Sequence, residues 1–466
     1  MVPISCLLDV PPAFAPKARY AWVELLRPLG LEPSFREDEE EEAPVLYYGP
    51  HPERSGARLA LGCAPETPAF FERPRPLDRA WVRWLEWDGE RWPVPIGSRA
   101  ERGPFAGLDL VASAFWWLSG WQEAATRQRD VHGRFPFSAS LQAALGTAHL
   151  PAVDAYRCAL ADALREAGIE PTPARWGTEE KPWAVLLSHD VDRVRRRRLG
   201  TLARGVAGGD PVGALRRALA PGNVDLDGLA ALLREAEARG GRATVFAKAG
   251  RTGRLDAPYR LGRQVRAALR EALRDGHDVG LHPSTFAMRH PRHLLREHDR
   301  LRRAVRSGPM VVRAHYLRFD PLRAPADLQR VGFVADASVG FSEAPGYRRG
   351  TGRPFPLWDL QTDRLAPLIE VPLAVMDTTL LGHLGMTPRE AADAALQVLR
   401  GARRTGSAAA VLWHNRPLDE PDGRDALAAY RLVLDAARSD GAALLPLEAV
   451  LPIERGAFNV ALRRRA

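Results

Sequence analysis

Short apolar runs alternate with amphipathic segments along most of the chain after Trp183. The runs have the length of buried strands and cover residues 184–188, 243–247, 278–282, 310–314, 332–336, 368–373 and 409–413. Between several of them apolar residues recur at helical spacing, which predicts helices over 226–240 and 265–276. Strands that alternate with helices predict βαβ units, and therefore a parallel sheet or barrel.

The first part of the chain has a different pattern. Strand-like pieces at 45–49 and 81–87 precede one long amphipathic segment at 109–127, which predicts a single helix. The stretch EPTPARWGTEEKP holds three prolines and several charges, and it is typical of a linker. We therefore expect a smaller α/β domain over 1–175 and a barrel domain over 180–456.

Titratable residues gather at the ends of the predicted barrel strands. His189, Asp190 and Asp192 follow the first strand, and His282 ends the third. The fourth strand ends in Arg313 and His315, and His414 follows the last. Because the carboxyl ends of parallel strands meet at one edge of a sheet or barrel, we expect these side chains to lie together.

Carboxylates and imidazoles at one barrel mouth suit metal-assisted hydrolysis. They bind zinc or a related divalent ion, with cobalt, nickel and manganese as alternatives, and leave a position for water. Such an ion lowers the pKa of water towards ~7 while a free carboxylate takes its proton. A histidine on the other side can then protonate the leaving group.

Five motifs follow one another along the chain: HDVD at 189–192, ATVF at 243–246, GHDVGLHPST at 276–285, an arginine motif within 311–319, and VLWHN at 411–415. In this order they resemble the motifs of the polysaccharide deacetylases of the NodB-homology type, carbohydrate esterase family 4. The resemblance implies an incomplete (β/α)7 barrel. It also implies a metal-dependent carbohydrate N-deacetylase that acts in surface polysaccharide or cell-envelope glycan biosynthesis.

The same resemblance implies a role for individual residues. Asp190 corresponds to the general base, Asp192 and His282 to metal ligands, and His414 to the general acid. Arg313 corresponds to the arginine that orients the base. Further candidates for substrate binding are Arg318, Arg348 and Trp413.

One position departs from the family pattern. The family has a second ligating histidine four residues after the first, and Phe286 stands there in this chain. His315 and His189 are the predicted replacements, whereas His290 lies too far along a helix, at ~12 Å. Two alternatives stay open: a degenerate relative that binds glycans without cleaving them, and a hydrolase of the same fold that acts on a non-sugar amide.

A second resemblance covers the first domain. The stretches LDLVASAFWWLSGWQE and RDVHGRF, at 108–123 and 129–135, are similar to a domain of unknown function of the DUF7033 type. This domain precedes a deacetylase domain in many bacterial proteins, and the tract at 346–360 resembles the same subgroup. In RDVHGRF we expect a turn shaped by Asp130 and Gly133, with His132 in a structural role.

Charge adds little to this assignment. The formal net charge of +9 comes almost entirely from arginine, because Lys17, Lys181 and Lys248 are the only lysines. The arginines are scattered and no binding motif accompanies them, so no nucleic-acid partner is expected. The block at 195–198 is interpreted as a solvated helix face, with peripheral contact to an anionic membrane as the alternative.

Cysteine content and the first residues bear on location. Cys6, Cys63 and Cys158 are far apart, which excludes a thiolate zinc site and fits a reducing compartment. Asp9 and Pro11 interrupt the apolar start, so no signal peptide is predicted, and no apolar run reaches the ~18 residues of a membrane span. We expect a cytoplasmic protein whose carbohydrate substrate is a nucleotide- or lipid-linked precursor.

Overall fold

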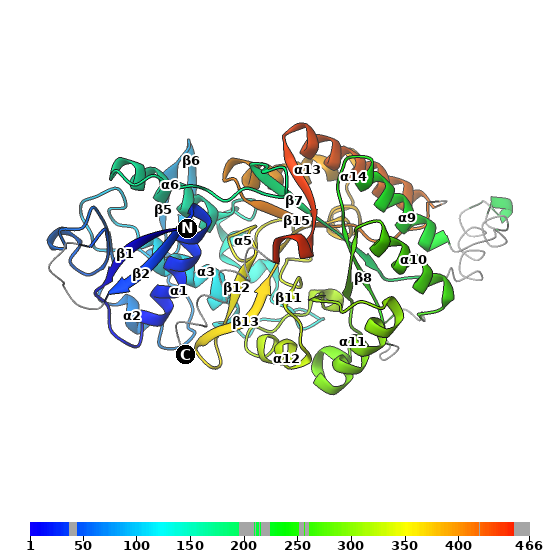
Figure 1. The fold of residues 1–466 in the computed structure, drawn as a ribbon, viewed down its shortest axis with the longest axis horizontal. Coiled ribbons are helices and arrows are strands. Elements are labelled where there is room, and N and C mark those ends of the chain that lie inside the picture. The colour runs from blue at the N-terminus through cyan, green and yellow to red at the C-terminus, as the bar shows by residue number, and fades with distance from the viewer. Residues whose placement is uncertain are drawn as a thin grey trace.

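The computed structural model describes residues 1–36, 44–194, 209, 211–213, 215, 224–250, 256, 261–418 and 420–451. The arginine block at 195–198 and the end of the second predicted domain lie outside the described residues. Figure 1 shows the first part of the chain, in blue and cyan, packed against one side of a barrel formed by the rest. No helix among the described residues is both long enough and apolar enough to cross a membrane.

The first part contains a four-stranded parallel sheet with the order β2-β1-β3-β4. Its elements are β1 (Val2–Leu8), α1 (Ala15–Leu26), β2 (Leu31–Arg36), β3 (Leu46–Gly49), β4 (Leu59–Gly62), α2 (Thr67–Phe70), the hairpin β5 (Arg83–Trp87) and β6 (Glu90–Val94), α3 (Leu110–Ser119), α4 (Trp121–Ala124), α5 (Leu141–Leu145) and α6 (Ala152–Glu166). The helix predicted over 109–127 is therefore split. Gly120 adopts a φ of 73°, a left-handed conformation that ends α3 and that glycine tolerates best.

The second part is built on a ten-stranded sheet with the order β12-β13-β11-β10-β9-β8-β7-β15-β14, in which β16 also pairs with β7. Its strands are β7 (Trp183–Val191), β8 (Thr244–Ala247), β9 (Asp278–Leu281), β10 (Val311–Val312), β11 (Ala335–Asp336), β12 (Phe355–Asp359), β13 (Arg364–Glu370), β14 (Leu373–Met376), β15 (Ala408–Leu412) and β16 (Ala442–Pro446). All pairs are parallel except β12 with β13.

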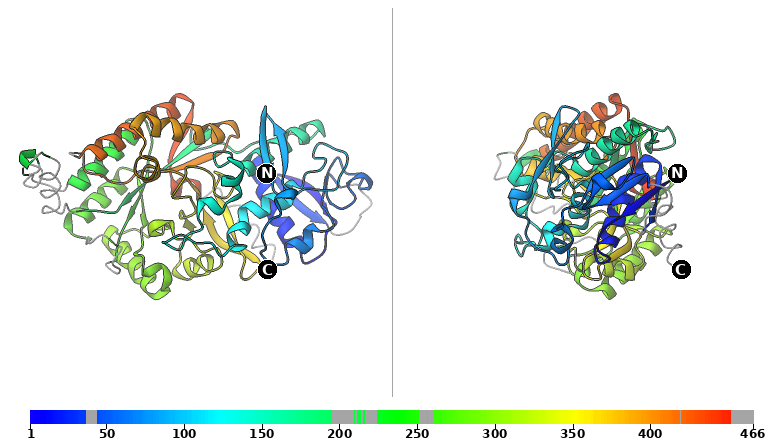
Figure 2. Two further views of the ribbon diagram at one scale, coloured as in Figure 1. Left: turned by 180° about the vertical axis from the view of Figure 1, so that it is seen from behind. Right: turned by 90° about the vertical axis from the view of Figure 1, so that its left-hand side faces the viewer.

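Helices surround this curled sheet, as the view from behind shows (Figure 2). They are α9 (Val224–Glu237), α10 (Arg263–Arg274), α11 (Pro291–Val305), α12 (Ala324–Val331), α13 (Pro388–Arg404) and α14 (Pro421–Ser439). The predicted fold class, an α/β chain with an incomplete barrel and a smaller α/β part, is confirmed. Sequence patterns missed β12 and β16, and the predicted run 368–373 merged the end of β13 with the start of β14, so the sheet has three strands more than the seven expected.

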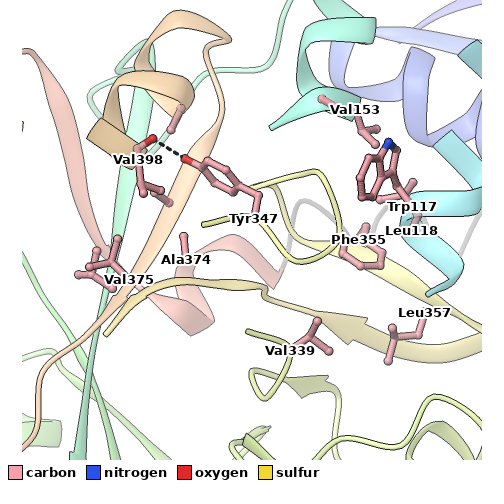
Figure 3. Close-up of a cluster of buried hydrophobic side chains, with 14 of the residues drawn as sticks. Trp117, Leu118, Val153, Val339, Tyr347, Phe355, Leu357, Ala374, Val375 and Val398 are labelled. Atoms are coloured by element: carbon pink, nitrogen blue, oxygen red, sulfur yellow. Dashed lines mark hydrogen bonds between the residues drawn. The ribbon is translucent and has the colours of Figure 1, made fainter. Parts of the chain in front are cut away.

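The two parts share one continuous hydrophobic core. Figure 3 shows Trp117 and Leu118 of α3 and Val153 of α6 facing Phe355 and Leu357 of β12. In the same cluster the Tyr347 hydroxyl donates a hydrogen bond to the carbonyl oxygen of Val398, at 2.9 Å. The first part therefore forms one wall of the core of the second.

A buried ion cluster joins the two parts as well. The Glu123 carboxylate of α4 lies 2.5 Å from Arg348 Nη2 and 3.2 Å from Arg349 Nε. Arg348 also contacts the rings of Phe135 and Phe341. The prediction that Arg348 binds substrate is wrong, because its guanidinium is buried in this interface and occupied by Glu123.

Glu123→Gln is expected to destabilise the protein strongly. The change leaves two buried guanidinium groups without a carboxylate, which costs about 3–5 kcal/mol in comparable cases. Urea unfolding followed by fluorescence measures the loss. The matched control is Glu66→Gln, whose exposed pair with Arg99 is worth at most about 1 kcal/mol. Equal stability of the two variants would contradict the structural role of the cluster.

Candidate active site

The alternation of side chains along β7 decides which residues reach the barrel interior. Successive side chains of a strand point to opposite faces, so Asp190 and His189 diverge. The His189 ring lies 3.0 Å from the carbonyl oxygen of Trp413 and 3.5 Å from the Tyr430 hydroxyl. Burial lowers the pKa of His189 to about 4. His189 is therefore a neutral core residue, and its prediction as a metal ligand is wrong.

Trp413 lies on the same outer side, after β15. Its indole Nε1 donates a hydrogen bond of 2.9 Å to the carbonyl oxygen of Ala426, and its ring packs against Tyr430. The side chain is fully buried. The prediction that Trp413 binds substrate is wrong, because the next residue, His414, is the one that turns towards the interior.

Three predicted ligands meet at the carboxyl ends of the strands. Asp192 Oδ1 lies 3.3 Å from His282 Nε2 and 3.6 Å from His315 Nε2. One ligand atom from each of these residues falls within 4.8 Å of the others. Asp192 Oδ1 is buried and accepts no hydrogen bond from any described residue. This triad is thus a candidate metal centre.

The hydrogen bonds at Nδ1 of His282 and His315 agree with a metal centre at this position. His282 Nδ1 lies 2.8 Å from the carbonyl oxygen of Arg313, and His315 Nδ1 lies 2.7 Å from Asp256 Oδ1. Since both partners are acceptors, each Nδ1 carries a hydrogen, which leaves the Nε2 of each ring as the atom that can offer a lone pair towards Asp192. Two lone pairs and a carboxylate oxygen that face one another are stabilised by a cation, and such carboxylate or carbonyl partners are usual behind metal-binding histidines.

Positive charge already surrounds the Asp192 carboxylate. Burial alone would raise its pKa, but the close contact and charge of His282, with the charges of His414 and Lys248, hold the pKa well below its usual range. The Lys248 ammonium lies 3.7 Å from Asp192 Oδ1. Asp192 is therefore ionised at neutral pH.

Asp190 is held by the buried arginine predicted to orient it. Arg313 Nη1 donates to Asp190 Oδ1 at 3.1 Å and to Ser188 Oγ at 2.8 Å, while Nε donates to the carbonyl oxygen of Ala337. The guanidinium also stacks over the Phe246 ring, at 4.3 Å from its centroid. With this many contacts Arg313 can hold one orientation of the Asp190 carboxylate.

His414 also lies beside the triad. Its Nε2 lies 3.8 Å from Asp192 Oδ2, and its Nδ1 lies 2.6 Å from Asp377 Oδ1. Burial would lower the pKa of His414, but the charge and hydrogen bond of Asp377 raise it to about 9. Arg416 holds the second oxygen of Asp377 at 3.0 Å. His414 is therefore a protonated imidazole at neutral pH, as a general acid must be.

These groups line one cavity of about 480 Å³. Its wall includes Asp190, Asp192, Lys248, His282, His315, Tyr316, Met376, His414 and Arg416, together with His132 and Arg134 from the first part of the chain. The expected turn in RDVHGRF is present, since Asp130 accepts from the backbone N–H of Gly133 and, through Oδ1, from that of His132. We expected only a structural role for His132, but its side chain also lines the cavity.

Two other predicted positions lie away from this wall. Arg318 is half-buried beside Arg289, and burial followed by the charge of Arg289 lowers its pKa. It is not among the lining residues, so its role in substrate binding stays a prediction. Phe286 is 38% exposed, and its ring stacks on His290 and meets His293 edge-on. The position where the family has its second histidine therefore faces away from the cavity here.

Several functional residues were missed by the sequence patterns. Asp377 follows β14 directly, and the strand-end argument would have found it had β14 been recognised as a strand separate from β13. Lys248 follows β8 in the same way. Asp256 stands in the connection between β8 and α10, so no pattern pointed to it.

Comparisons with known proteins complete this description. Comparison of the sequence with curated proteins finds no match. Among solved structures, one similar chain is a Mycobacterium smegmatis protein described as a polysaccharide deacetylase, with 19% identity, a TM-score of 0.43, and coverage of 61% of this chain and 95% of that one. An allantoinase has 14% identity, a TM-score of 0.40, and coverage of 60% and 91%. The peptidoglycan deacetylase PdaC from Bacillus subtilis has 13% identity, a TM-score of 0.33, and coverage of 61% and 96%.

Residues 8–168 match the model of a family of unknown function, DUF7033, which confirms the resemblance seen in the first part of the sequence.

Proposed function

We propose that this protein is a metal-dependent hydrolase that removes the acetyl group from an N-acetylated sugar. One observation carries the proposal. A carboxylate held by a buried arginine and a charged imidazole held by a buried carboxylate line the same cavity as the Asp192, His282 and His315 triad. A base, an acid and a cation site are the three requirements of metal-assisted amide hydrolysis.

Asp192, His282 and His315 would hold the ion. Two imidazoles and one carboxylate are a usual set of three protein ligands for zinc, which we propose as the metal. When bound, the ion would polarise the amide carbonyl and make water more acidic. His315 would take the place of the histidine that the family pattern puts at position 286.

The remaining residues would move the protons. Asp190 would take a proton from the attacking water, while Arg313 keeps its carboxylate pointed at the cavity. As the bond between the carbonyl carbon and the nitrogen breaks, His414 would give its proton to the leaving amine. The products are acetate and the free amino sugar. Asp377 would act through His414, because it holds the charged imidazole in place.

The size of the cavity agrees with a small substrate. A volume of about 480 Å³ lies in the range of small-molecule sites, which is ~300–1,000 Å³. We propose that a single sugar unit, carried on a nucleotide or lipid precursor of a cell-envelope glycan, enters this space.

Acetate release tests the proposal directly. The purified full chain, loaded with zinc, cobalt, nickel or manganese, is incubated with N-acetylhexosamine oligomers and with nucleotide-linked N-acetylhexosamine. We expect acetate release that depends on the metal. A protein that takes up none of the four metals at near-stoichiometric level would overturn the proposal. Turnover of a cyclic amide without acetate release would favour a hydrolase of another substrate class.

A further inference from the structure

A short turn of the first part of the chain reaches the barrel mouth. In this turn, residues 130–134, Asp130 Oδ1 accepts hydrogen bonds from the backbone N–H groups of His132 and Arg134, and Oδ2 accepts from Arg134 Nε at 2.6 Å. The Asp130 N–H in turn donates to the carbonyl oxygen of Arg134. These bonds make the turn a compact unit with a defined side-chain direction.

The segment that the turn meets has an unusual backbone. His315, the third predicted ligand, is followed by Tyr316 and Leu317, which have φ values of 62° and 53°. Residues with side chains rarely adopt this left-handed conformation, and two in succession need support from their surroundings. The preceding strand, β10, has only two residues, so little regular structure holds the segment in place.

The turn supplies that support through two contacts with Tyr316. Arg134 Nη1 donates a hydrogen bond of 3.2 Å to the Tyr316 carbonyl oxygen. The His132 ring stacks on the Tyr316 ring, with centroids 4.7 Å apart and planes 5° apart. Tyr316 in turn stacks on His315, at 4.2 Å. A continuous chain of contacts thus runs from the first part of the protein to the candidate ligand.

We propose that the turn at 130–134 positions the metal site: Arg134 and His132 hold the left-handed Tyr316 so that His315 Nε2 faces Asp192. This inference rests on the proposed metal site and assigns a role to the DUF7033-like part of the chain. The ligand that replaces the family histidine lies on an irregular segment, and a second region of the protein fixes that segment. Arg134 and His132 are therefore positioning residues.

Cobalt binding to the full chain tests the inference. The variants are Arg134→Ala and His132→Ala, with Arg127→Ala as control, because Arg127 is an exposed arginine just before the turn. We expect Arg134→Ala to weaken Co²⁺ affinity about 10- to 100-fold, as loss of a group that orients a ligand does, and to change the Co²⁺ absorption spectrum. His132→Ala is expected to change both in the same direction, and Arg127→Ala neither.

The outcomes distinguish a failure of the positioning role from a failure of the metal site itself. Thermal unfolding identifies any variant that does not fold, and His132→Ala serves as the test if Arg134→Ala does not fold. Folded Arg134→Ala and His132→Ala with wild-type Co²⁺ affinity and spectrum would overturn the positioning role alone. A wild-type protein that binds no Co²⁺ would overturn the metal site itself, and the positioning role with it.

Discussion

Asp192→Asn is expected to remove metal binding and, with it, activity. The variant keeps the shape of the side chain but loses the anionic oxygen that His282 and His315 face. Removal of a residue that hydrogen-bonds to a metal ligand usually weakens metal affinity ~10- to 100-fold. Because Asp192 is itself a proposed ligand, we expect its substitution to weaken Zn²⁺ affinity by more than that. Competition with a chelating dye measures the affinity, and acetate release measures the activity.

The matched control is Asp190, which lies on β7 two residues before Asp192. Asp190→Asn makes the same chemical change, but Asp190 is bound to Arg313 and is not one of the triad. It is expected to keep metal binding and to lose about 10²- to 10⁴-fold in kcat, the usual contribution of a general base. If Asp190→Asn lost the metal and Asp192→Asn kept it, the assigned roles would have to be exchanged.

Asp377→Asn is expected to have the second-largest effect, and the effect should depend on pH. Burial would lower the pKa of His414, but the charge and hydrogen bond of Asp377, followed by the charges of Asp192 and Asp190, raise it to about 9, so the imidazole of the wild type stays protonated up to that pH. Without the charge the pKa falls, and the acid form is lost at lower pH. The alkaline limb of kcat/KM should therefore move down, with a loss of about 10²-fold or more at pH ~8 and a smaller loss at pH ~6.

The control for this variant is Asp422→Asn. Asp422 also pairs with Arg416, at 3.5 Å, but it is half exposed and none of its contacts is with His414. Its pH profile should match the wild type. If the alkaline limb of kcat/KM did not move in Asp377→Asn, protonation of His414 would not be what determines that limb.

Strand order explains why part of the site could be predicted without a structure. Asp190 and Asp192 follow one apolar run, His282 ends a second and His414 follows a third, and parallel strands bring such positions to one edge. The same reasoning, extended by one strand, reaches Asp377. The alternation along β7 would also have separated His189 from Asp190, so that error came from treating neighbours in sequence as neighbours in space.

The sequence by itself determined the α/β barrel and its cluster of acids and imidazoles, because periodicity and strand ends are local properties of the chain. Which histidine joins Asp192 and His282 was decided only by the tertiary structure. His315 directly precedes the left-handed residues Tyr316 and Leu317. Asp256 bonds to His315 from 59 residues away in the sequence, and Arg134 bonds to Tyr316 from 182 residues away. Contacts of that kind depend on how two regions pack, and no local pattern records them.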